Sequence, residues 1–153
     1  KMILVLLMFI GACAGSTGGG FKISRLLILC KAIPKQLSLV IHPREVKVIR
    51  MDGKPIDHNT LRSTNVYLAI YFFILLVSTL LISVDNFNLT TNFTAVASTL
   101  NNIGPGLDGV GPTRNFGMYS DFSKFVLMFD MLAGRLELYP LLILFMPSLW
   151  RRK

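Results

Sequence analysis

Residues that commonly form disulfides or bind metals are scarce in this sequence. Its 153 residues include only two cysteines, Cys13 and Cys30, and two histidines, His42 and His58. Both cysteines lie in apolar stretches, and no group of His and Cys has the spacing of a metal site. The sequence therefore predicts neither a disulfide scaffold nor a bound metal or other cofactor, and the two histidines are expected to be surface residues.

Charge is absent from one long stretch of the chain. Residues 63–84 contain no Asp, Glu, Lys or Arg. As a helix, they would extend over about 33 Å, enough to cross the hydrocarbon core of a bilayer. The chain is also 52% hydrophobic, with a mean hydropathy of +0.57, and both values are high for a soluble domain. We therefore predict an integral membrane protein with a transmembrane helix at 63–84.

Acidic residues are few, 8 against 16 basic ones, which gives a net charge of +8. Most of the basic residues lie in 22–62 and 151–153, directly beside apolar runs, as in loops that stay on the cytoplasmic side of a membrane. Segment 85–124 should face outward because its charged residues are only Asp85, Asp108, Arg114, Asp121 and Lys124. We expect contact with membrane lipid and no nucleic-acid partner.

Three apolar segments organise the chain: 2–30, which glycines interrupt, 63–84, and 122–150. With residues 31–62 in the cytosol, the first segment runs inward, the second outward and the third inward again, so every basic cluster falls on one side. This threading predicts an all-α integral membrane fold. Within the cytosolic connector, 32–62, residues 46–49 alternate like a strand and Asp52-Gly53 is a hairpin turn signal.

The segment between the second and third apolar runs carries a shorter helical pattern. Apolar residues recur at helical spacing from Leu89 to Leu100, and hydroxyl residues fill the other faces. As a helix this stretch is about 18 Å long, roughly half a bilayer, and Gly104-Pro105-Gly106 would stop it. Two interpretations stay open from the residues alone. One is a re-entrant segment, and the other is a short helix on the outer surface that ends in a Gly-Pro turn.

The residues after this helix are candidates for ion binding through their backbone: Asn102, Ile103, Gly104, Pro105 and Gly106. The negative end of the helix dipole would point toward the middle of the membrane and favour a cation there. Glycine lets the backbone turn its carbonyl oxygens toward a pore axis, where such oxygens replace the hydration water of potassium. A filter built from side chains would need acidic residues, which this stretch lacks.

A run of small residues interrupts the first apolar segment: Gly15, Ser16, Thr17, Gly18, Gly19 and Gly20. Each glycine is unfavourable in a helix by about 1 kcal/mol relative to alanine, so the run should break the helix. The residues that follow, Phe21-Lys22-Ile23, do not match a nucleotide-binding P-loop. Close helix packing is the alternative to a functional loop.

Arg135 lies about halfway along the third apolar segment, at the depth expected for the glycine break. An arginine in mid-membrane is costly, and this makes it a candidate functional residue. The backbone carbonyls of a broken helix could accept its hydrogen bonds. A purely structural link between helices is the alternative.

Two short patterns suggest other chemistry. Ile10-Gly11-Ala12-Cys13 follows an apolar run and looks like a lipoprotein processing site with an acylated cysteine. Asn88 and Asn92 begin glycosylation sequons, a pattern short enough to occur by chance. The later apolar segments make a lipid anchor unnecessary.

Three stretches, GACAGSTGGGFK, LNNIGPGLDGVGP and AGRLELYPLLILFMPSLWRR, together resemble the C-terminal part of Trk/Ktr-type potassium uptake proteins. The resemblance covers essentially the whole chain. It implies four repeats around one pore, each consisting of a helix, a pore helix, a filter and a second helix. Residues 1–31 would end the third repeat. The fourth repeat, 63–153, would comprise a transmembrane helix at 63–84, a pore helix at 89–101, a filter at 102–106 and a transmembrane helix at 121–150.

The resemblance also implies a function, potassium uptake across the cell membrane, with potassium as the substrate and no enzymatic step. The filter would bind the ion through the backbone carbonyls of Asn102, Ile103 and Gly104. The loop Gly15–Gly20 would gate the pore below the filter, and Arg135 would set the position of the gate.

A single copy of this chain could not enclose a potassium ion, because only one filter strand is present. We therefore expect a C-terminal piece of a longer protein in a bacterial inner membrane, crossing it several times. The expected partners are the remaining repeats, a second full-length copy and a cytosolic nucleotide-binding regulatory subunit. Two rivals are a pore assembled from about four copies of this chain, and a lipid-anchored binding module processed at Cys13.

Overall fold

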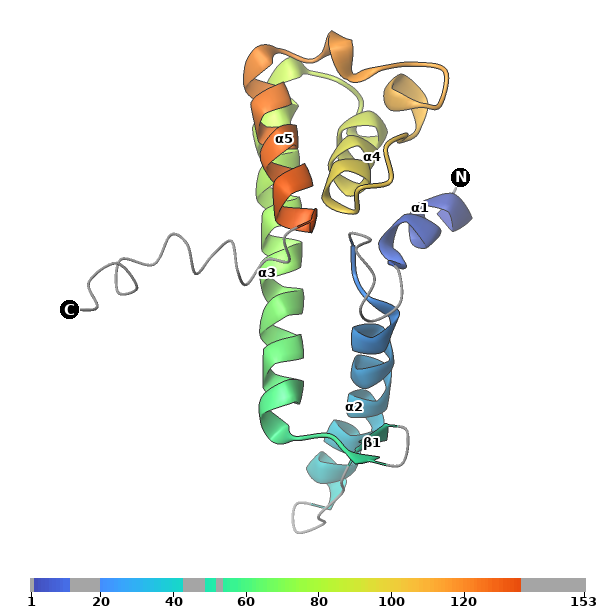
Figure 1. Cartoon of the computed structure of the whole chain (residues 1–153), viewed down its shortest axis with the longest axis vertical. Helices are drawn as coiled ribbons and strands as arrows, with labels where there is room; N and C mark the ends of the chain where they lie inside the picture. Colours follow the sequence, from blue (N-terminus) through green and yellow to red (C-terminus); the bar gives the residue numbers. More distant parts are fainter. Residues whose placement is uncertain (1, 12–19, 43–48, 52–53, 136–153) are drawn as a thin grey trace, which may run out of the picture.

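The computed structural model describes residues 2–11, 20–42, 49–51 and 54–135, and these are mostly helical (Figure 1). The α-helices within these residues are α1 (Met2–Phe9), α2 (Ile23–Ile41), α3 (His58–Ile82), α4 (Leu89–Leu100) and α5 (Asp121–Arg135). Short 3-10 turns connect the later helices: η1 (Ser83–Asp85), η2 (Asp108–Val110) and η3 (Phe116–Met118). Two strands, β1 (Arg50–Met51) and β2 (Lys54–Pro55), lie between α2 and α3.

The longest helix, α3, has the composition of a membrane span. Within the described residues it is the one helix long and apolar enough to cross a bilayer, as the stretch Asn59–Asp85. It lies where the sequence predicts a transmembrane helix, at 63–84. One stripe of α3 is buried, including Tyr71, whereas Phe73 on another face is 68% exposed. Large apolar side chains exposed on a long helix are typical of a surface covered by lipid or by further helices.

The other helices divide the length of α3 between them. In Figure 1, α4 and α5 lie beside the upper half of α3, and α2 lies beside its lower half. The core between α3, α4 and α5 contains Leu75, Val96, Leu100, Leu127 and Ala133. The chain after α4 returns to the same end of α3 from which α4 started (Figure 1). This path has the form of a re-entrant segment, because α4 runs along α3 and not across its end.

The connector between α2 and α3 contains a minimal β-hairpin. Arg50 pairs with Pro55 in antiparallel register, and the Ile56 N–H donates to the Ile49 carbonyl oxygen at 2.8 Å. The pairing confirms a hairpin in this connector, and it adds two short strands to a fold expected to be all-α; the predicted turn residues, Asp52 and Gly53, lie outside the described residues. Residues 46–48 of the predicted strand lie outside the described residues.

α2 starts where the glycine-rich run ends and extends past residue 31 into the expected connector, as far as Ile41. Before it, Ile10 and Phe21 form a parallel bridge, and the Gly11 N–H donates to the Phe21 carbonyl oxygen at 3.0 Å. The bridge brings the two ends of the glycine-rich region side by side. The first apolar segment is therefore divided between two helices, as a helix-breaking run predicts.

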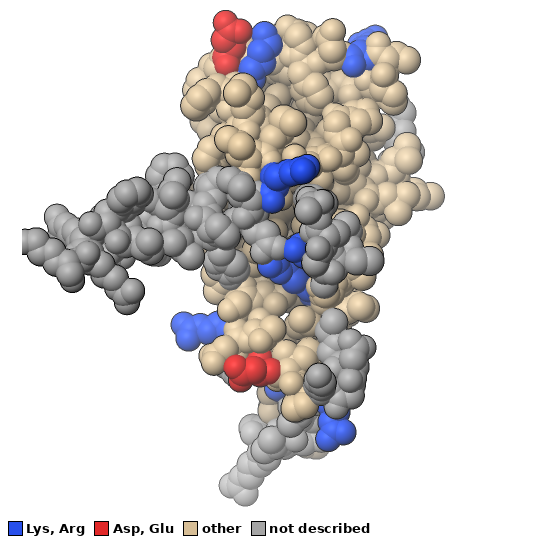
Figure 2. Space-filling model, in the orientation of Figure 1, with Lys and Arg blue, Asp and Glu red and all other residues tan. Residues whose placement is uncertain are grey.

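Basic side chains gather in the middle and lower parts of the molecule. Figure 2 shows charged side chains at the upper end, an uncharged band below them, and basic side chains from the middle of the molecule downward, with an acidic group among them near the lower end. The described lower elements, α2, the hairpin and the start of α3, contribute Lys31, Lys35, Arg50 and Arg62. A basic end separated from the other end by an apolar band is typical of a membrane protein whose basic loops stay in the cytosol.

Candidate functional site

α4 ends at a left-handed asparagine. Asn102 has a φ of 54°, and its N–H donates to the Thr99 carbonyl oxygen at 3.0 Å. The Ile103 N–H donates to the Ser98 carbonyl oxygen at 2.9 Å. These two bonds form a Schellman motif, and asparagine is one of the few residues besides glycine that adopt this conformation. The prediction that Gly104-Pro105-Gly106 stops the helix is therefore wrong, because the motif closes the helix before Gly104.

Threonine side chains of α4 hold the segment that follows it, residues 102–109, which we call the return segment. Thr94 Oγ1 accepts a hydrogen bond from the Leu107 N–H at 3.1 Å, and Thr91 Oγ1 donates to Asp108 Oδ2 at 3.3 Å. Both threonines are buried, and their spacing of three residues places them on one face of α4. The return segment is thus attached along the helix that it follows.

Ser98 continues this hydroxyl face by one further turn. Its side chain is fully buried, and Ser98 Oγ donates to the Gly104 carbonyl oxygen at 2.6 Å. Gly104 has a φ of 104° with open space around the position of a Cβ, so glycine is required there for its backbone conformation. Gly106 is required for space instead, because a Cβ on it would lie 3.1 Å from the Thr94 carbonyl oxygen.

Asn101, the last residue before the return segment, joins three elements. Its Oδ1 accepts a hydrogen bond from the Tyr71 hydroxyl of α3 at 2.8 Å, and its Nδ2 donates to the Ala97 carbonyl oxygen at 2.8 Å. Gly20 packs so closely that a Cβ on it would lie 2.7 Å from Asn101 Oδ1. The end of the glycine-rich run therefore contacts the end of α4.

An aromatic cluster fixes this end of the glycine-rich run against α3. The Phe21 ring lies 6.1 Å from that of Tyr67 and 6.3 Å from that of Tyr71, measured between centroids. The Arg25 guanidinium lies 3.9 Å above the Tyr67 ring, in the geometry of a cation–π contact. Of the predicted gating loop, Gly20 is the described member, and Gly15, Ser16, Thr17, Gly18 and Gly19 lie outside the described residues.

The end of α5 packs tightly against the end of α4. Asn102 Nδ2 donates to the Met131 carbonyl oxygen at 3.2 Å. A Cβ on Gly134 would overlap the Leu100 carbonyl oxygen and would lie 2.8 Å from Asn102 Nδ2. The absence of a side chain at Gly134 therefore allows the two helix ends to meet.

Arg135, predicted to position the gate, is the last described residue of α5, and its side chain is exposed. The structure places it next to Gly134 and therefore near the end of α4. Its relation to residues 15–19 lies outside the described part of the chain, as does the rest of the helix expected at 121–150. The role of Arg135 stays a prediction.

A buried carboxyl group lies farther up the contact between α3 and α5. Asp130 is fully buried, and its Oδ1 accepts a hydrogen bond from the Ser78 hydroxyl at 2.7 Å. No described residue donates a hydrogen bond to its other oxygen, Oδ2, which is buried. Sequence patterns do not predict this contact, because Asp130 and Ser78 are 52 positions apart.

Cavities flank both sides of the return segment. One of about 550 Å³ lies toward α1, and its lining includes Leu7, Asn101 and Pro105. Another of about 450 Å³ lies toward α5, and its lining includes Gly104 and Met128. Asn102 and Ile103 line both cavities. Within the described residues, no donor contacts the carbonyl oxygens of Asn102, Ile103 or Pro105.

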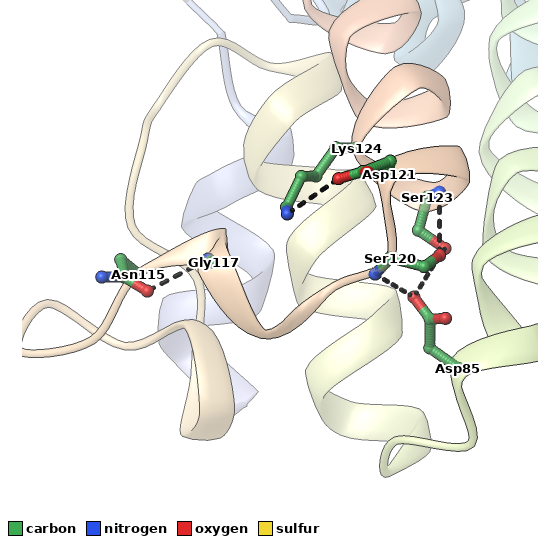
Figure 3. Close-up of polar contacts among 7 residues, drawn as sticks. All are labelled: Asp85, Asn115, Gly117, Ser120, Asp121, Ser123 and Lys124. Atoms are coloured by element: carbon green, nitrogen blue, oxygen red, sulfur yellow. Dashed lines mark hydrogen bonds and ion pairs between the residues drawn. The ribbon is translucent and has the colours of Figure 1, made fainter.

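At the upper end of the bundle in Figure 1, hydrogen bonds anchor the loop that leads into α5 (Figure 3). Asp85 accepts hydrogen bonds from the Ser120 N–H at 3.0 Å and from the Ser120 hydroxyl at 3.1 Å. Ser120 Oγ in turn accepts from the Ser123 N–H at 3.3 Å and so caps the first turn of α5. Lys124 pairs with Asp121 at 3.3 Å on the exposed face.

Tyr119, just before this cap, anchors the start of α4. Its hydroxyl donates to Asn92 Oδ1 at 2.9 Å, and burial together with the nearby Asp85 carboxylate raises the pKa of Tyr119 to about 12. The phenol therefore keeps its proton at physiological pH. Asn92 is only 2% exposed, so the structure gives no support to its sequon as a glycosylation site.

The described residues contain no group of three or more His, Cys, Asp or Glu side chains that could hold a metal ion. Cys30 is an exposed free thiol, and Cys13 lies outside the described part of the chain. Any ion held by residues 101–107 would therefore meet backbone and amide oxygens, since this stretch has no acidic side chain.

These features define a class of protein: a helical membrane protein in which a half-length helix and an irregular return segment lie between longer helices. The model of the TrkH family, described as a cation transport protein, matches residues 1–152. The chain belongs to this family, and the resemblance to Trk/Ktr-type proteins is confirmed.

Relatives of known name agree with this assignment. The Trk system potassium uptake protein TrkH of Vibrio parahaemolyticus is 39% identical over 150 residues, a match that covers 98% of this chain and 30% of the relative. The Escherichia coli K12 protein of the same name is 37% identical over 150 residues, covering 98% and 31%.

A solved structure supports the fold. The crystal structure of the potassium transporter TrkH from Vibrio parahaemolyticus matches with a TM-score of 0.86 and 38% identity, over 98% of this chain and 32% of that one. The chain thus spans less than a third of the length of the relatives it matches.

Proposed function

We propose that this chain contributes one filter strand to a membrane protein for potassium uptake. The observation that carries the proposal is the two-sided character of the return segment. One side is hydrogen-bonded to α4, whereas no described donor contacts the carbonyl oxygens of Asn102 and Ile103. The names of the relatives, potassium uptake proteins, support the choice of ion.

The proposed chemistry is selection of potassium by backbone oxygens. Carbonyls of Asn102, Ile103 and Gly104 replace hydration water, and residues 102–106 together form the filter strand. The Gly104 oxygen shares this role with its hydrogen bond from Ser98, because a carbonyl oxygen has two lone pairs. The C-terminal end of α4 adds a favourable field for a cation. Transport needs no covalent chemistry, and potassium is the substrate.

The filter requires strands that this chain does not supply. Three further strands would come from the remaining repeats of the same transporter, in keeping with relatives about three times as long. In a bacterial inner membrane, the full protein would span the bilayer several times, pair with a second copy and respond to a cytosolic nucleotide-binding subunit. Mass measurement in detergent tests the rival, since a pore assembled from this chain alone needs about four copies.

The proposal includes a gate beside the filter, formed by Gly15–Gly20 with Arg135 setting its position. Two contacts support the location of this loop. Gly20 packs against Asn101, and the bridge between Ile10 and Phe21 brings the ends of the glycine-rich region together next to the return segment.

The experiment is substitution of Gly104 by serine in the full polypeptide in which this sequence occurs, expressed in a host that lacks potassium uptake. The positive φ of Gly104 strains any L-residue, so we expect the filter to distort and selection against sodium to weaken. Rubidium and sodium uptake are the readouts. Gly111→Ala serves as a control because Gly111 has a φ of −64°. Unchanged rubidium uptake and sodium exclusion in Gly104→Ser would refute the filter assignment.

A further inference from the structure

Ser98 uses its side chain differently from Thr79 of α3 and from its own neighbour Thr99. Thr79 Oγ1 donates to the Leu75 carbonyl oxygen at 2.7 Å, and Thr99 Oγ1 donates to the Ala95 carbonyl oxygen at 3.0 Å. Both bonds stay within one helix, four residues back, as is usual for hydroxyl side chains in helices. Ser98 Oγ instead donates out of α4 to the return segment.

Two neighbouring peptides of the return segment depend on Ser98. Its hydroxyl donates to the Gly104 carbonyl oxygen at 2.6 Å, and its own carbonyl oxygen accepts from the Ile103 N–H at 2.9 Å. Ser98 itself is 0% exposed, so its hydroxyl is held inside the protein beside the return segment. A single residue of α4 therefore fixes the return segment at two successive positions.

The peptide between Gly104 and Pro105 has few other restraints. Proline has no N–H, so the Gly104 carbonyl is the only polar group of this peptide that can form a hydrogen bond. Apart from the chain neighbours of Gly104, no described atom lies within 4 Å of the position of a Cβ on this residue, so nothing packs against that side of the backbone. Among the described residues, Ser98 is the polar contact that sets the direction of this carbonyl.

We propose that Ser98 is a positioning residue for ion selection: its hydroxyl sets how far the Gly104 carbonyl turns toward the ion path. This inference rests on the proposed function of residues 102–106 as a filter strand. Without the hydroxyl, the Gly104 carbonyl loses this contact and can turn within the limits that the proline ring sets, which changes the direction in which its oxygen faces the ion. Discrimination between potassium and sodium depends on the number and field strength of such oxygens.

The test compares Ser98→Ala with Ser123→Ala in the full polypeptide, expressed in a host without potassium uptake. Ser123 is a matched control because it is also a fully buried serine, located in the outer cap of α5 and away from the return segment. The readouts are the ratio of sodium to rubidium uptake and the amount of protein in the membrane. We expect Ser98→Ala to raise the ratio about two- to tenfold, the range of one lost hydrogen bond, and Ser123→Ala to leave it unchanged.

A wild-type ratio in Ser98→Ala, at normal protein levels, would overturn the inference. If Ser98→Ala does not reach the membrane, Ser98→Cys takes its place, because a thiol has a similar size but is a weak donor. The expected ratio for Ser98→Cys lies above wild type, and a wild-type value would again overturn the inference.

The same assay separates failure of this inference from failure of the proposed function. If Gly104→Ser changes the ratio and Ser98→Ala does not, the filter assignment stands and the role of Ser98 is refuted. If neither variant changes the ratio, the filter assignment itself is refuted. An equal effect of Ser123→Ala would mean that loss of any buried serine loosens the protein, and this too would overturn the specific role of Ser98.

Discussion

Substitution of Gly134 by alanine tests how closely the ends of α4 and α5 must meet. An ideal Cβ at Gly134 would overlap the Leu100 carbonyl oxygen and would lie 2.8 Å from both the Leu100 carbonyl carbon and Asn102 Nδ2. Both Leu100 atoms belong to backbone and cannot rotate away as a flexible side chain would. The alanine variant therefore requires a movement of one helix relative to the other.

The size of the effect follows from these contacts. Non-bonded atoms normally stay about 3.5 to 4.0 Å apart, so the helices must separate by roughly 1 Å. Overpacking of this kind costs about 1 to 3 kcal/mol of folding free energy. The movement also stretches the hydrogen bond between Asn102 Nδ2 and the Met131 carbonyl oxygen, now 3.2 Å, which holds the start of the return segment.

The assay is thermal unfolding of the full polypeptide in detergent, together with the ratio of sodium to rubidium uptake. We expect Gly134→Ala to lower the unfolding midpoint and to raise the uptake ratio. Leu132→Ala is the control on the same helix, since Leu132 is 55% exposed and its truncation leaves the contact with α4 intact. A Gly134→Ala protein with the midpoint and ratio of Leu132→Ala would refute the close approach of the two helices.

Two further substitutions test buried hydrogen bonds. Tyr71→Phe removes the donor to Asn101 Oδ1 and should cost about 1 kcal/mol, seen as a lower unfolding midpoint; an unchanged midpoint would mean that this bond contributes no stability. Asp130→Asn keeps an acceptor for the Ser78 hydroxyl and removes a buried group that can carry charge, so its midpoint should equal or exceed wild type. Ser78→Ala should lower the midpoint, and a larger loss in Asp130→Asn would instead indicate a cationic partner for Asp130 in the full polypeptide.

Local patterns in the sequence predicted the main elements. The uncharged stretch 63–84 predicted α3, because a helix that crosses a bilayer needs a long run of apolar residues. Helical spacing between Leu89 and Leu100 predicted α4. The Asp52-Gly53 pair predicted the hairpin because Asp-Gly is a common sequence for a two-residue turn between paired strands. Each of these signals lies within a few consecutive turns of chain.

The details of the site depend on contacts between distant segments and were not predictable in this way. Thr91, Thr94 and Ser98 lie at helical spacing in the sequence. The sequence of their own helix does not show that the return segment is their hydrogen-bond partner. The end of α4 lies where the sequence predicted it, but the part of Asn102 in ending the helix was missed because the glycines at 104 and 106 are the stronger helix-breaking signal. Gly134 gave no signal, since its role depends on where α4 ends.

In a membrane, the return-segment carbonyls that no described donor contacts are evidence about the function of this segment. Each backbone polar group without a partner costs several kcal/mol in the hydrocarbon region, so irregular backbone persists there only where protein surrounds it or it lines a wet cavity. Hydrogen bonds with α4 satisfy one side of the return segment, whereas no described donor contacts the carbonyl oxygens of Asn102 and Ile103. A turn with only a structural role would be more stable if neighbouring side chains donated hydrogen bonds to all of its carbonyl oxygens. A segment held firmly on one side and left unpaired on the other is therefore better suited to carbonyl oxygens that exchange their partner, as ion conduction requires.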